Sequence, residues 1–154
     1  MGWMFSRLRR LDLPAAIVAG LAGGVAFYVT MLLDLRIGRN VDDRIFLGRP
    51  LVKDPEQAKA AGTVMHAVNS AAFGVAYALV EDRIPGPPWW KGTLFFNIEN
   101  VVLYPLTAVG KRHPAIRDGQ IDEYWNLPAF LQSIPRHVAY GAALGIVSDR
   151  MRRR

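Results

Sequence analysis

The feature that most constrains this chain is the run from Leu13 to Leu33, which contains no charged side chain. A helix of that length rises about 30 Å, which matches the hydrocarbon core of a bilayer. A surface helix of a soluble protein needs only one apolar stripe and carries polar residues on its opposite face. Here, large apolar side chains occur in every direction around the helix. The run therefore predicts a membrane-spanning helix.

Three further apolar segments predict a polytopic membrane protein. We expect an all-α fold, a single four-helix transmembrane domain over residues 1–154. The expected spans are residues 13–33, 60–80, 91–109 and 134–149. A rigid Pro-Gly-Pro-Pro turn separates the second and third spans, whereas the loops 34–59 and 110–133 are long and polar.

The starts of the second and fourth helices carry local signals. Asp54 followed by Pro55 is a capping residue with proline at the first helical position, so the second helix should begin near Pro55. The fourth helix has two candidate starts, near Leu127 and near Ile134. Because proline favours a first helical turn, we favour Ile134, which places Arg136 at the headgroups. A start near Leu127 would place Arg136 about 13 Å along the helix.

Charge and cysteine content restrict the location of the protein. The net charge is +6, and basic residues gather beside the apolar spans at both ends: Arg7, Arg9, Arg10, Arg150, Arg152, Arg153 and Arg154. This placement indicates cytoplasmic flanks rather than a nucleic-acid surface. Four spans put both termini on one side, so we expect a bacterial inner-membrane protein with both ends cytoplasmic, although the loop 34–59 is also basic. Without cysteine, disulfides, thiolate metal ligands and iron–sulfur clusters are excluded.

An internal repeat relates the second and fourth spans. The segment 66–74 aligns with 137–145, each beginning with histidine and ending with glycine, and each helix ends in an Asp-Arg pair. This pattern predicts two repeated helical hairpins in the same orientation. Small residues at steps of four let membrane helices approach closely. The positions expected to pack in this way are Gly20, Gly24, Ser70, Gly74, Gly141 and Gly145.

Glu99 lies inside the third expected span, where an ionised carboxylate is expensive. We expect it to face the interior and to be protonated or paired. Its candidate partners are Arg136, His66 and His137, with Asn69, Asn97 and Asn100 as hydrogen-bond donors. The interpretation that we favour is a buried polar network built on Glu99, Arg136, Asn69 and Asn97. A proton or ion pathway and a contact with another subunit are the alternatives.

The two repeated histidines raise the question of a cofactor. His66 and His137 should lie at similar depth, and bis-histidine ligation of a b-type haem is one alternative. A non-haem metal held by these residues and Glu99 is another. The interpretation that we favour is ordinary hydrogen bonding. No nucleophile motif, phosphate-binding loop or zinc pattern occurs in the sequence, so we expect no enzymatic activity.

The chain resembles a group of small four-span bacterial inner-membrane proteins of unassigned function. The resemblance rests on His66 to Gly74, His137 to Gly145 and the glycines of the first span, and covers about half of the chain. It implies no catalytic residues. We expect a small accessory or assembly subunit of a larger membrane complex, respiratory or photosynthetic, with the lipid bilayer and other membrane subunits as partners and no nucleic acid. The alternatives are a homo-oligomeric channel or transporter that uses Glu99, and a haem electron carrier.

Overall fold

The computed structural model describes residues 11–153, and no strand occurs in that range. The long helices are α2 (Leu13–Asp34), α4 (Pro55–Val80), α5 (Pro88–Leu103) and α7 (Leu127–Arg152). The short elements are α3 (Asp43–Gly48), η1 (Glu81–Arg83), η2 (Tyr104–Arg112) and α6 (Pro114–Arg117). The all-α fold class is confirmed. Four of the basic residues that flank the expected spans lie outside the described residues: Arg7, Arg9, Arg10 and Arg154.

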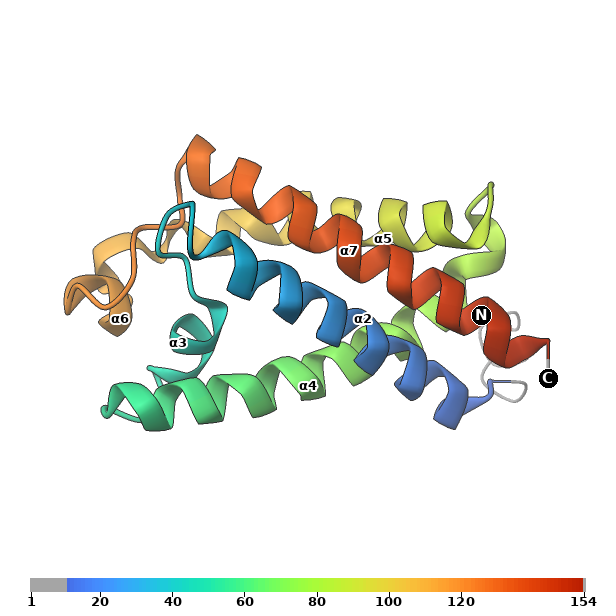
Figure 1. The fold of residues 1–154 in the computed structure, drawn as a ribbon, viewed down its shortest axis with the longest axis horizontal. Helices are drawn as coiled ribbons and strands as arrows, with labels where there is room; N and C mark the ends of the chain where they lie inside the picture. The colour runs from blue at the N-terminus through green and yellow to red at the C-terminus, as the bar shows by residue number, and fades with distance from the viewer. Residues whose placement is uncertain (1–10, 154) are drawn as a thin grey trace.

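The four long helices within residues 11–153 form a bundle whose outer helices, α4 and α5, meet at one end and diverge at the other (Figure 1). We call these the closed end and the open end. Helix α2 packs between α4 and α7, and α7 also packs on α5 (Figure 1). The outer helices α4 and α5 meet near η1, where the rings of Tyr77 and Phe95, like those of Phe73 and Phe96, lie 5.5 Å apart. Toward the other end the two helices diverge, and α3 packs on α4 there (Figure 1).

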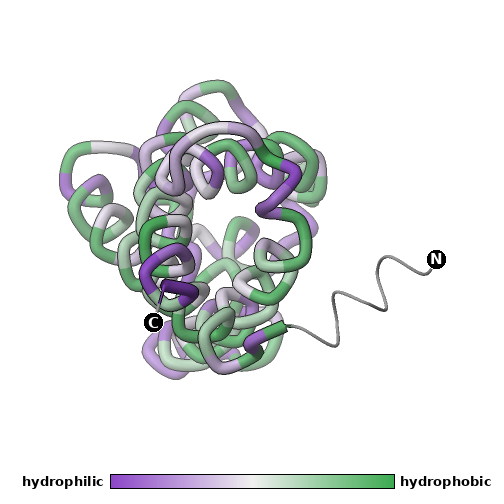
Figure 2. The backbone as a smooth tube through the Cα atoms, turned by 90° about the vertical axis from the view of Figure 1, so that its right-hand side faces the viewer, coloured by the Kyte–Doolittle hydropathy of each residue, from purple (hydrophilic) through white to green (hydrophobic). Residues whose placement is uncertain are grey.

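Two helical segments, α2 and residues Pro55–Arg83, are long and apolar enough to cross a membrane. In the second segment, only 17% of the residues in the most apolar 18-residue stretch are buried. A core helix of a soluble protein would hide most of that surface. Seen end-on, hydrophobic residues occur on all sides of the helices (Figure 2).

The predicted starts of the first two long helices are confirmed. The Asp12 side chain accepts a hydrogen bond from Ala15 N, and Asp54 accepts one from Gln57 N. Each carboxylate thus satisfies a backbone N–H that the first helical turn leaves free. A proline at the first or second helical position follows each cap.

The predicted start of the fourth helix near Ile134 was wrong, because α7 begins at Leu127. The Asn126 side chain caps this start by accepting from Ala129 N, and Pro135 lies inside the helix. Side chains around Pro135 supply donors to carbonyls of this turn. Ser133 Oγ donates to Phe130 O, and His137 Nδ1 donates to Ser133 O.

The third helix is also shorter than predicted. The α-helix ends at Leu103 rather than continuing to Val109, and the chain tightens into the 3₁₀ helix η2. Pro105 has no N–H to donate to the carbonyl four residues earlier, so the α-helical pattern stops there. Gly110, with φ +48°, then turns the chain away.

All six small residues singled out in the sequence lie at contacts between long helices. A Cβ on Gly20 would lie 2.9 Å from Gly74 Cα, and one on Gly24 would lie 2.9 Å from Ser70 Cβ. In the second hairpin, a Cβ on Gly92 would lie 2.9 Å from Gly145 N. A Cβ on Gly141 would in turn meet the backbone of Gly92. The α2–α4 and α5–α7 hairpins therefore use equivalent backbone contacts.

We expect Gly74→Val to destabilise the α2–α4 contact by about 2 kcal/mol or more, because the new side chain meets backbone that cannot move aside. Denaturant titration of the purified protein in detergent measures this change. Ala67→Val, on the exposed side of the same helix, is the matched control and should change stability by less than about 0.5 kcal/mol. Equal effects of the two substitutions would contradict the packing assignment.

Candidate functional site

The two long loops fold together into a cap over the open end of the bundle. We call this assembly the loop cap, residues 35–54 and 104–126. Asn40 N donates to Asp122 Oδ2, and Asp122 N donates to Asn40 O. Arg49 reaches across to Asp118 at 2.5 Å. A small apolar core lies inside, formed with the first turn of α7: Val41, Ile45, Ala115, Ile121, Tyr124 and Ala129. Ile45 is therefore buried, although it lies in a loop that is polar in sequence.

Aromatic stacking fixes α6 against α3 within the loop cap. The rings of His113 and Phe46 stack at 4.3 Å with 9° between their planes. His113 Nδ1 accepts from Ala115 N and so caps α6. Burial lowers the pKa of His113 below its ordinary value, which keeps the ring neutral and Nδ1 free to accept.

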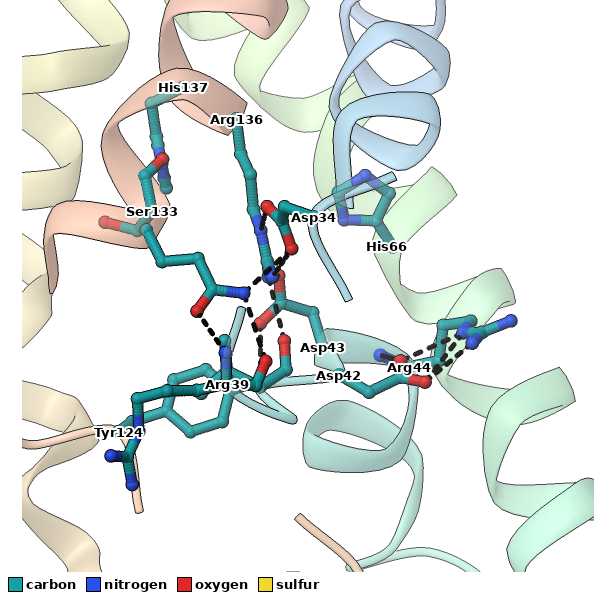
Figure 3. Close-up of polar contacts among 12 residues, drawn as sticks. Asp34, Arg39, Asp42, Asp43, Arg44, His66, Tyr124, Ser133, Arg136 and His137 are labelled. Carbon is teal, nitrogen blue, oxygen red and sulfur yellow. Dashed lines mark hydrogen bonds and ion pairs between the residues drawn. The ribbon is translucent and has the colours of Figure 1, made fainter. Parts of the chain in front are cut away.

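Arg136 is the most deeply buried charge of the site, with 2% of its surface exposed. Its guanidinium bonds both oxygens of Asp34, with Nε–Oδ2 at 2.6 Å and Nη2–Oδ1 at 2.5 Å. Nη1 donates to Val41 O at 2.8 Å and contacts Asp43 Oδ2 at 3.2 Å. One side chain of α7 therefore holds the end of α2 and the start of α3 (Figure 3).

Neighbouring polar groups complete this cluster. Tyr124 OH donates to Asp43 Oδ1 at 2.8 Å. Burial raises the pKa of Tyr124 well above its ordinary value, so the hydroxyl keeps the proton that it donates. Gln132 donates to Asp34 Oδ1 and accepts from Arg39 N (Figure 3). Arg136 was predicted to pair with Glu99 and instead pairs with Asp34 and Asp43.

A cavity of about 410 Å³ lies beneath the loop cap, between the diverging α4 and α5. Aromatic and apolar side chains form most of its wall. Polar groups also line it, among them His66, Glu99, Asn100, Arg136 and His137. The exposed Asn69 on α4 and Leu106 on η2, which also line the cavity, lie at its mouth. Its size is in the range of ordinary small-molecule sites.

Glu99 and His137 face each other in this cavity. Glu99 Oε2 lies 3.5 Å from His137 Nε2, within ion-pair distance, but it is buried and has no hydrogen bond. His137 Nδ1 lies 2.8 Å from Ser133 O, and a carbonyl only accepts, so Nδ1 carries a proton. A second proton, on Nε2 or on the carboxyl, is needed to bridge the pair.

The two histidines do not leave an open slot for haem. Phe27 contacts both rings, with centroid distances of 5.0 Å to His66 and 5.3 Å to His137. A haem between the imidazoles would have to displace this phenyl ring. His66 Nε2 also lies 3.3 Å from Gly24 O. Within residues 11–153, no group of three His, Asp or Glu side chains is arranged to hold a metal ion, which contradicts the non-haem alternative.

The predicted polar network is divided in the structure. Asn69 lines the cavity and is exposed, whereas Asn97 donates to Thr93 O of its own helix. Asn100 lines the cavity and donates to Ser133 Oγ on α7 at 2.8 Å. The sequence interpretation missed Asp34 and Asp43. The one sequence signal for Asp34 is its position directly after the first apolar run.

A second buried carboxylate ties the closed end of the bundle together. Glu81 lies 2.7 Å from Arg152 Nη1 and accepts from Ser148 Oγ at 3.0 Å. These contacts join the end of α4 to the end of α7, far from the cavity.

We expect Arg136→Met to destabilise the fold by about 3–5 kcal/mol, because Asp34 and Asp43 lose their cationic partner in a buried site. Denaturant titration in detergent measures the loss. Arg36→Met removes an exposed arginine at the same end of the bundle and is the matched control. Equal shifts for the two variants would show that the cluster adds nothing beyond surface charge.

Comparison with known proteins assigns the family. A family profile described as a family of unknown function, DUF6789, matches residues 11–154. Searches of curated proteins and of solved structures give no match. Since the profile covers nearly the whole sequence, the chain belongs to the DUF6789 family.

Proposed function

We propose that this protein is a four-span integral membrane protein that serves as a non-catalytic accessory subunit of a larger membrane complex. The observation that carries the proposal is the placement of exposed apolar side chains on the loop cap, outside the expected hydrocarbon layer. Ile37, Leu51 and Leu106 are 90%, 63% and 68% exposed. Apolar surface of this kind marks contacts with other proteins or with the membrane surface.

Packing supports four spans rather than two. Helix α7 packs along α2, and α5 packs along α7, so a membrane that α2 crosses would also surround these two helices. The outward side of α5 is apolar, with Ile98, Val101 and Val102 exposed. Trp89 and Trp90 begin α5 at the closed end, and Trp125 lies at the cap end. Exposed tryptophans at both ends fit the two interfacial belts of a spanning bundle.

The proposed location is a bacterial inner membrane with both chain ends in the cytoplasm and the loop cap on the opposite side. Support comes from the basic C-terminal end and from the resemblance to small inner-membrane proteins. Many of the loop-cap cations lie beside carboxylates, as in the Arg44–Asp42 pair at 2.6 Å and the Arg49–Asp118 pair. These basic residues therefore form ion pairs within the loop cap, whichever side of the membrane the cap occupies.

Single cysteines test the four spans, because the natural chain has none. We expect Lys53→Cys and Lys111→Cys to react with an impermeant maleimide added outside intact cells. Pro85→Cys should react only after the cells are opened. All three positions are exposed, so labelling reports the side of the membrane rather than burial. Labelling of Pro85→Cys together with Lys53→Cys from one side would contradict a spanning α4.

The accessory role predicts co-purification at fixed ratio. We expect the tagged protein, extracted from its native membrane in mild detergent, to retain one or more larger membrane subunits stoichiometrically. Leu106→Ser should release them, whereas Val101→Ser, on the lipid-facing side of α5, should not. Recovery of a homo-oligomer alone would reject the accessory role. That result would favour the channel or transporter alternative, for which the unpartnered Glu99 Oε2 in the cavity is the specific support.

A further inference from the structure

We propose that the cavity between α4 and α5 binds lipophilic organic cations, with Glu99 as the counter-ion and with release of one proton. This inference does not depend on the accessory role. It rests on three features of the cavity: its access, its charge and its aromatic wall.

Access comes from the splay of the bundle. Aromatic rings of α4 and α5 meet near η1, and the two helices diverge toward the other end (Figure 1). Side chains of both helices line the cavity. Asn69 on α4 and Leu103 at the end of α5 line the cavity and are also exposed. This mouth lies on the side of the bundle, whereas the loop cap covers the end. A ligand that partitions into the bilayer would therefore reach the cavity directly.

The charge of the cavity favours a cation. The charged side chains that line it, within the described residues, are Asp43, Glu99 and Arg136. Arg136 is already committed to Asp34 and Asp43, and that trio carries a net charge of −1. Glu99 adds a second negative charge, which only a protonated His137 can offset. An anionic ligand would meet these carboxylates in a cavity whose wall is mostly apolar.

The aromatic wall suits a bulky, weakly hydrated cation. Phe96 and Tyr140 stack with centroids 3.6 Å apart, and Phe27 and Phe73 lie beside them along the cavity. Aromatic faces attract cations through the ring quadrupole, most strongly where water is excluded. Glu99 Oε2 adds a buried acceptor with no hydrogen bond. A carboxylate beside aromatic rings matches a quaternary or tertiary onium group better than a small hydrated ion.

Binding would exchange the ligand for a proton. With one bridging proton, the Glu99–His137 pair is neutral. Loss of that proton to solvent leaves the pair with a charge of −1. A bound monovalent cation restores neutrality. The other titratable groups around Glu99 come from each neighbouring element: His66 on α4, Asp43 on α3, Tyr104 on η2, Tyr124 in the loop cap, and Arg136 and Tyr140 on α7. Because the proton competes with the ligand, affinity should rise with pH.

Isothermal titration with tetraphenylphosphonium tests the inference on the full chain in detergent, with empty micelles titrated in parallel. We expect saturable binding that tightens as the pH rises, because the bound proton competes with the ligand. Glu99→Gln should weaken binding by roughly tenfold or more and remove the pH dependence. Glu123→Gln removes an exposed carboxylate of the loop cap and is the matched control, which should bind like the natural protein.

Tetraphenylborate provides a test that needs no variant, because it has the same shape as tetraphenylphosphonium and the opposite charge. We expect it to bind the natural protein at least about tenfold more weakly than tetraphenylphosphonium. Similar affinities for the two ions would show an apolar cavity without charge selection and would overturn the proposal. Absence of saturable tetraphenylphosphonium binding, or unchanged binding to a folded Glu99→Gln protein, would also overturn it.

Discussion

The buried guanidinium of Arg136 is the interaction on which the rest of the structure depends. It joins Asp34 at the end of α2 to Asp43 at the start of α3. Arg136 itself belongs to α7, so it also links the α2–α4 hairpin to the α5–α7 hairpin. Removal of an ion pair from water is expensive and is repaid only with good geometry and further hydrogen bonds. Here the geometry is bidentate to Asp34, Tyr124 donates to the other oxygen of Asp43, and Gln132 adds a second donor to Asp34 Oδ1. The position of the loop cap on the bundle follows from this cluster.

Glycine contacts explain why the bundle closes at one end and opens at the other. Gly20 with Gly74, and Gly92 with Gly145, bring the backbones of each hairpin together toward the closed end. At the open end, α3 packs on α4 through Gly62, where a Cβ would meet the backbone of Arg44. The short helix thus follows α4 away from α5. The cavity is a consequence of both contacts, since α4 packs on α2 toward the closed end and on α3 at the open end.

Much of the helical framework could be predicted from local sequence, whereas the site depends on distant contacts. Asp54 with Pro55 predicted the start of α4, because a cap and its first turn are only three residues apart. The partners of Arg136 lie 93 and 102 residues away, and no local pattern indicates them. Pro135 misled the prediction because the helix already starts at the Asn126 cap and continues through the proline. The two loops appeared as separate insertions, and their common core has no periodic signal.

The cavity carries one carboxylate, Glu99, that the contacts between the long helices do not require. Helix α7 is already held to α2 by Arg136 and to α5 by glycine contacts, so the bundle does not need Glu99 as a connection. An apolar residue at that place would avoid the cost of burying a carboxylate. Glu99 instead faces His137 with one oxygen unbonded, inside a space walled by aromatic rings. Arg136 cannot neutralise Glu99, because the fold engages it with two other carboxylates. A site that is negative, aromatic and open to the side of the bundle is therefore a product of the same cluster that fixes the loop cap.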